Sequence, residues 1–143
     1  MQPSAADGHN PHVPRELEIC CYSVSDAQIA ERFGADRIEL CAGRPEGGTT
    51  ASLGVLRSAI ESLTIPVFPM VRPRGGDFVY DDLEFSAMCD DVRTIAEMGF
   101  RGLVFGILDS SGGVDVGRSA ALLDIARQAN PAIEVTFHRA FDE

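Results

Sequence analysis

Short apolar runs alternate along the whole chain with longer segments of helical periodicity. In these longer segments the apolar residues recur every three or four positions, as in a helix that buries one face. Such segments begin near Ser25, Ser52, Asp81 or Asp82, and Val116. The apolar runs have the length of strands and lie at residues 17–22, 37–41, 65–71, 102–105 and 134–137. This order predicts an α/β protein with a parallel sheet and right-handed crossovers.

Capping residues set the predicted boundaries of the first helix. Ser25 is followed three residues later by Gln28, which is the pattern of a capping box. Gly34 suits the end of the helix, where a left-handed residue is common. We therefore expect the helix to begin at Ser25, with Ile29, Ala30 and Phe33 in its apolar stripe.

The spacing of the strands favours a barrel over an open sheet. Predicted strands start about 20 to 35 residues apart, which is the spacing of βα units in a (β/α)8 barrel. Five strands could form a complete open sheet, but the chain ends directly after the fifth strand and would leave its edge uncovered. We therefore predict a TIM-like (β/α)8 barrel, here a partial barrel of about five βα strands in a truncated chain. Pairing with a second copy could stabilise such a piece, so a homo-oligomer is among the expected assemblies.

Alternation within residues 37–41 predicts which side chains face the barrel interior. Successive strand residues point to opposite faces. Ile38 and Leu40 should pack against helices, which leaves Arg37, Glu39 and Cys41 on the inner face.

The same parity gathers further polar residues on the inner face. It places Glu18 and Cys20 there from the first strand, and Arg72 is inward if Met70 is. In the fifth strand Val135 and Phe137 should face outward, which leaves Glu134, Thr136 and His138 inward. Charged groups on an inner face are costly unless they are paired or functional. One interpretation is a network of ion pairs that fills the barrel. The other is a functional pocket, because barrel enzymes carry their chemistry at the carboxyl ends of the strands.

Two arginines stand where the third strand ends. Arg72 and Arg74 lie on either side of a proline and are followed by the glycine pair 75–76. Such a loop suits an anion site. Arg74 could instead brace the loop against an acid such as Asp77. Both interpretations remain open from the sequence.

Composition limits the classes of function. The chain of 143 residues, 45% of them hydrophobic, suffices for about one domain, which we place at residues 16–143 after a disordered tail at 1–15. The tail carries His9 and His12, which we interpret as solvent-exposed side chains and not as metal ligands.

The net charge of −10 argues against nucleic-acid partners and anionic membranes. No apolar run is long enough to cross a bilayer, and the absence of lysine excludes Schiff-base and Walker-type chemistry.

Four cysteines carry the remaining candidate chemistry. The spacing of Cys20, Cys21, Cys41 and Cys89 indicates neither a disulfide framework nor a zinc ribbon, so reduced thiols in the cytoplasm are the default. Cys20 and Cys41 end neighbouring strands and point inward, where two thiolates could hold a soft ion such as Cu(I). Two buried, inert thiols would give the same pattern.

Six motifs together resemble the CutC family of copper homeostasis proteins. They occur in the order LEICCYS, GADRIELCAG, EGGTTAS, RPRGGDFVY, GLVFGIL and TFHRAFD, and the resemblance covers residues 16–143. The resemblance implies a cytosolic TIM-like barrel and a longer chain. It also implies copper handling, with Cu(I) bound by the cysteines at positions 20 and 41.

Two functional hypotheses follow. The first is a cytosolic, copper-binding homeostasis protein with Cys20 and Cys41 as ligands. The alternative is a barrel enzyme of unknown reaction on a small anionic substrate. In that case Arg72 and Arg74 would bind the anion, and Glu39 and His138 would act as acid and base.

Overall fold

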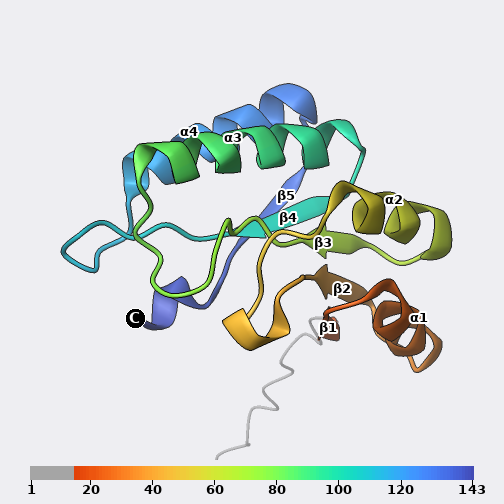
Figure 1. Ribbon diagram of the computed structural model, residues 1–143. Coiled ribbons are helices and arrows are strands. Elements are labelled where there is room, and N and C mark those ends of the chain that lie inside the picture. Colours follow the sequence, from red (N-terminus) through yellow and green to blue (C-terminus); the bar gives the residue numbers. More distant parts are fainter. Residues whose placement is uncertain (1–14) are drawn as a thin grey trace, which may run out of the picture.

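The fold of residues 15–143 is described by a computed structural model (Figure 1), so the tail predicted at 1–15, with His9 and His12, lies almost wholly outside the described residues. The strands are β1 (Glu18–Cys21), β2 (Arg37–Leu40), β3 (Val67–Pro69), β4 (Gly102–Phe105) and β5 (Glu134–Phe137). The helices are α1 (Val24–Arg32), α2 (Leu53–Ser62), α3 (Asp82–Glu97) and α4 (Val116–Ala129). Short 3₁₀ turns, η1 (Arg44–Glu46) and η2 (Arg139–Asp142), follow β2 and β5.

All strand pairings are parallel and follow the order of the sequence. One sheet has the order β1-β2-β3, and β4 pairs with β5 in a second. A parallel bridge between Met70 and Val104 joins the two sheets, and the amide of Val71 donates to the Val104 carbonyl at 2.7 Å. The predicted α/β class with parallel strands is therefore confirmed.

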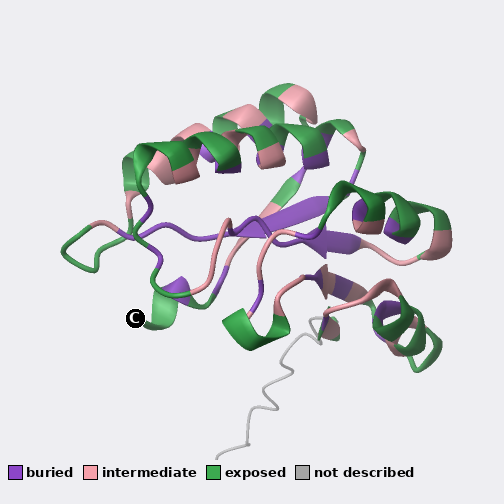
Figure 2. Cartoon of the chain, viewed as in Figure 1, coloured by how far each residue is buried: buried purple, intermediate pink, exposed green. Residues whose placement is uncertain are grey.

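The hydrophobic core lies between the strands and the helices. Ile38 and Leu40 of β2 are fully buried in it, as the strand parity predicts. Met88, Val92 and Ile95 form the buried face of α3. Helices α3 and α4 cover β4 and β5, and their buried positions face the strands (Figures 1 and 2). The opposite side of the strands is thereby left to line a cavity.

The N-cap of helix α1 (Val24–Arg32) lies two residues earlier than the sequence predicts. Ser23, not Ser25, is the N-cap, and its hydroxyl accepts a hydrogen bond from the Asp26 amide at 3.0 Å. The predicted apolar stripe is wrong for Ile29 and Phe33, which are 52% and 80% exposed, whereas Ala30 packs against the core as predicted. The helix instead buries Ala27, whose small side chain lets α1 approach the strands closely. Apolar and polar residues are mixed along this short helix, so the sequence does not determine which of its faces is buried.

The predicted starts of α2 and α3 are correct. The Ser52 hydroxyl accepts from the Val55 amide, and Asp81 forms a capping box with Glu84. Within the described residues, no helix combines the length and apolar character needed to span a bilayer.

Candidate functional site

The inner face of the strands lines a cavity of about 580 Å³. It opens where the strands end, among the loops that follow β2, β3 and β5. Its lining includes the inward residues that the strand parity predicts, namely Glu18, Cys20, Glu39, Arg72, Thr136 and His138. The parity prediction is therefore confirmed for β1 and β2, and Met70 and Arg72 share the inner face as expected. For β5 it is confirmed only in part, because Phe137, predicted to face outward, also lines the cavity, whereas Glu134, predicted to face inward, pairs with Arg101 instead.

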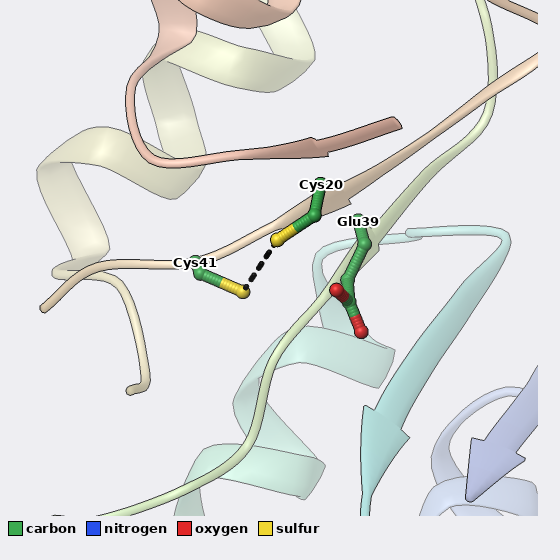
Figure 3. Close-up of side chains that lie close together, drawn as sticks. All are labelled: Cys20, Glu39 and Cys41. Carbon is green, nitrogen blue, oxygen red and sulfur yellow. Dashed lines mark hydrogen bonds between the residues drawn. The ribbon is translucent and has the colours of Figure 1, made fainter. Parts of the chain in front are cut away.

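Two thiols meet at one wall of this cavity. Strands β1 and β2 pair with Cys20 opposite Glu39, which places Cys41 diagonally across from Cys20. Their sulfur atoms lie 3.8 Å apart and point toward one another (Figure 3). A carboxylate oxygen of Glu39 lies within 4.8 Å of both sulfurs. Of the described residues, these three form the only group of three potential ligands.

The two cysteines differ in their access to solvent. Cys20 is exposed, whereas Cys41 is 1% exposed and packs with Phe68 and Met70. Gly48 covers Cys41 from the loop after η1, and a Cβ at this glycine would lie only 3.2 Å from the Cys41 sulfur. A ligand would therefore reach the pair from the side of Cys20.

The hydrogen bond between the two thiols shifts their pKa values in opposite directions. Donation from Cys41 lowers the pKa of Cys20, although burial and the nearby Glu39 oppose this shift. The same hydrogen bond, together with burial, raises the pKa of Cys41. Burial also raises the pKa of Glu39. Cys20 is therefore the thiol that ionises first, and binding a metal through both sulfurs releases the proton of Cys41.

The donor set fits a soft monovalent metal better than zinc. If metal–sulfur bonds are about 2.3 Å long, two of them span at most about 4.6 Å, so a separation of 3.8 Å is within reach of one ion. Soft thiolates select Cu(I), whereas structural zinc sites have four N or S ligands. Cys20 and Cys41 supply only two, with one carboxylate beside them.

Arg72 is enclosed by the loops around the cavity. It is 1% exposed, and its terminal nitrogens donate to the carbonyls of Glu46, Gly48 and Gly76. Its guanidinium also lies over the ring of Phe78, 4.6 Å from the centroid. Arg72 thus holds the loops after β2 and β3 together while it lines the cavity.

Arg74 has a different environment from Arg72. It forms ion pairs with Asp77 and Glu84 and donates to the Val79 carbonyl at 2.8 Å. It is not among the residues that line the cavity. This arrangement matches the bracing role that the sequence left open, and the proposed role in anion binding stays a prediction.

Part of the inner charge is paired within the fold. Arg37 forms an ion pair with Glu18 and lies over the Phe68 ring at 4.3 Å. The network interpretation therefore holds for this pair. Glu39, Arg72 and His138 have no ion-pair partner among the described residues, so the network does not extend to them.

His138 is a buried, neutral imidazole near pH 7. Its Nδ1 accepts a hydrogen bond from the Ala140 amide at 3.2 Å, which caps η2. Burial, followed by the charge of Arg72, lowers the pKa of His138 to about 4. The ring is therefore a weak base, and its role in acid–base catalysis stays a prediction.

This lowered pKa predicts a pH-dependent stability. The folded pKa of about 4 lies below the ordinary value of 6.5, so between these values the unfolded chain binds more protons. Stability is then lost as the pH falls from 6.5 toward 4, by about 3 kcal/mol for this group. In His138→Asn the amide oxygen can still cap Ala140, but no imidazole is left to titrate. We therefore expect this variant to lose about 3 kcal/mol less stability over the same pH range. Chemical denaturation of both proteins at pH 7 and pH 4.5 measures it, and equal losses would contradict the assignment.

Sequence reasoning missed several cavity residues, among them Phe78 and Arg139. The ring of Phe78 lies 4.9 Å from that of His138, and the Arg139 guanidinium lies 5.8 Å from the Phe78 centroid. Arg139 lies two residues after the end of β5, and this position could have identified it. Phe78 lies in the loop after β3, where no periodicity predicts orientation.

Comparison with known proteins identifies similar chains. The sequence model of the CutC family matches residues 15–143. A family protein CutC from Klebsiella pneumoniae is 58% identical over 126 residues, which cover 88% of this chain and 49% of that protein. One from Yersinia enterocolitica is 54% identical over 127 residues, covering 89% of this chain and 48% of that protein. The chain thus spans about half the length of the curated relatives it matches.

A solved structure is also similar. It is the crystal structure of CutC from Streptococcus agalactiae, a protein provisionally assigned to copper homeostasis. It superposes with a TM-score of 0.81 at 36% identity, over 89% of this chain and 60% of that one.

Proposed function

The chain belongs to the CutC family, and from this membership and the paired thiols we propose that it is a copper homeostasis protein that binds Cu(I). Cys20 and Cys41 are the ligands. The single observation that carries the proposal is the 3.8 Å separation of their sulfur atoms at the wall of an open cavity. The naming of the Streptococcus agalactiae protein for copper homeostasis supports it.

The surroundings of the thiols suit a site that takes up and releases an ion. Cys20 is exposed and has the lowered pKa, so it would make the first bond to an incoming ion. Cys41 would add the second bond from the buried side. Glu39 would accept the proton that Cys41 loses, because its carboxylate is near both sulfurs and its pKa is raised.

The compartment and the architecture belong to the same proposal. All four cysteines are free thiols in the structure, which supports a reducing compartment such as the cytosol. The sequential order of parallel strands, with helices on one side, supports the TIM-like barrel that the sequence predicts. The thiols then lie where barrels commonly carry their chemistry.

Titration of Cu(I) into reduced, metal-free protein tests the proposal. In competition with a coloured Cu(I) chelator, we expect one ion to bind per chain. X-ray absorption at the copper edge should show two sulfur neighbours. Coordination by nitrogen or oxygen alone, or failure to compete with the chelator, would refute the proposed site.

A further inference from the structure

The wall of the cavity that includes Arg72 and His138 carries two buried N–H groups without partners. Arg72 Nε and His138 Nε2 are both enclosed, and neither has a hydrogen-bond partner of good geometry in the described part of the chain. The two residues are 1% and 8% exposed. The Tyr80 hydroxyl, which also lacks such a partner, lies beside Arg72 on the side of the core. Buried donors are normally satisfied, because an unsatisfied one loses its hydrogen bonds to water without replacement. Both residues line the same cavity, so a ligand in it is the candidate for the missing acceptor.

The hydrogen bonding of His138 fixes which nitrogen carries the proton. Its Nδ1 accepts from the Ala140 amide, so in the neutral ring the proton is on Nε2. The nitrogen without a partner is therefore a donor. It can bind a carboxylate, phosphate or carbonyl oxygen, but it cannot accept a hydrogen bond.

The charge of Arg72 is also incompletely balanced. Carbonyl oxygens satisfy both terminal nitrogens, yet the side chain forms no ion pair with a described carboxylate. A buried guanidinium without an anionic partner is costly. An anion that accepts from Nε would supply both the missing hydrogen bond and the missing charge.

A third cation lies at the mouth of the same cavity. Arg139 is exposed and has no hydrogen bond or ion pair with the described residues. Its guanidinium packs over the backbone of Gly47, where an added Cβ would lie 2.5 Å from a terminal nitrogen. Phe78 is the common neighbour, because the side chains of Arg72, Arg139 and His138 all flank its ring.

Acidic groups line other parts of this cavity. Glu18 is neutralised by Arg37, and Glu39 lies beside the thiols. Asp142 lines the cavity from η2, the same turn that carries Arg139. Because these carboxylates line other parts of the cavity, the unpaired donors lie together around Phe78.

We propose that Arg72 Nε, His138 Nε2 and the Arg139 guanidinium bind the carboxylate or phosphate group of a small organic anion. The remainder of the anion occupies the cavity toward Cys20 and Glu39. A volume of about 580 Å³ is in the range of small-molecule sites. The residues that bind the anionic group are other than the two thiols, and the site does not require copper.

Nuclear magnetic resonance of the reduced, copper-free chain tests this site. Inorganic phosphate and malonate are titrated separately into ¹⁵N-labelled protein, against sodium chloride at equal ionic strength. We expect the Arg72 Nε–H and His138 Nε2–H resonances to shift with a dissociation constant of about 1 mM or tighter. Saturation by phosphate, malonate or both supports the site and tells which oxyanion it prefers. If neither anion shifts these two resonances beyond the chloride control, the inference is overturned.

Matched variants separate the site from general attraction of anions. Arg139→Ala, at an exposed position, should weaken binding about tenfold or more, as should His138→Asn, which keeps the cap of η2. Arg57→Ala removes another exposed arginine, from α2 and outside the cavity lining, and should leave the affinity unchanged. Equal weakening by Arg57→Ala and Arg139→Ala would refute the assignment.

Discussion

Replacing Cys20 and Cys41 together by serine is expected to weaken Cu(I) binding by roughly three orders of magnitude or more. Both soft ligands are lost, and a serine hydroxyl is a poor substitute because Cu(I) favours sulfur. No other described cysteine is close enough to compensate, since Cys21 faces the core and Cys89 lies on α3. Competition with a Cu(I) chelator, under the conditions used for the unchanged protein, measures the loss.

Two single variants make this result specific. Cys89→Ser changes a half-buried thiol away from the site and should leave the affinity for Cu(I) unchanged. Cys20→Ser alone should weaken binding strongly at little cost in stability, because Cys20 is exposed. Cys41 is enclosed, so its variant needs a denaturation control. A double variant that still binds like the unchanged protein would remove the thiols as ligands.

Strand parity explains why much of the cavity could be predicted from the sequence. In β2, buried Ile38 and Leu40 alternate with Arg37 and Glu39, and only one face can pack against helices. This alternation assigns Glu39 to the inner face without any knowledge of the fold. The 3.8 Å between the sulfurs was not predictable, because it depends on the register that sets Cys20 opposite Glu39.

The loops limited the remaining predictions. Arg72 and Arg74 are two residues apart in one loop and look equivalent in the sequence. Their environments differ because Arg72 is enclosed by carbonyls of two loops, whereas Arg74 reaches Glu84 at the start of α3. Such differences arise from contacts between segments distant in sequence, which periodicity does not encode. The unpaired donor on His138 was unpredictable for the same reason.

The beginning of α1 shows a different limit. Ser23 and Ser25 both precede helical residues, and each can cap a helix. The Gln28 signal favoured Ser25, but the extended backbone of Ser23, two residues after the end of β1, made it the N-cap. Cap choice between close candidates is decided by where the preceding strand ends.

The second large effect concerns Gly102, the first residue of β4. Gly102→Ala is expected to destabilise the fold by about 3 kcal/mol, at the upper end of the cost of overpacking a core. An added Cβ would lie 2.7 Å from Cδ2 of Phe68 and closer still to two other ring atoms. The ring cannot move away easily, because it is 1% exposed and lies beneath Arg37 at 4.3 Å. Chemical denaturation of the variant and the unchanged protein measures the difference.

Two comparisons identify the collision with Phe68 as the cause. Gly54→Ala, in α2, meets no atom closer than 4.0 Å and should be neutral or stabilising by at most about 1 kcal/mol. Phe68→Leu should lose less stability when Gly102 is already alanine than when it is glycine, because the smaller side chain makes room for the new methyl group. If the two substitutions add independently, the ring is not the obstacle. Since Phe68 packs with Cys41 and Met70, a real collision should also reduce Cu(I) affinity in Gly102→Ala but not in Gly54→Ala.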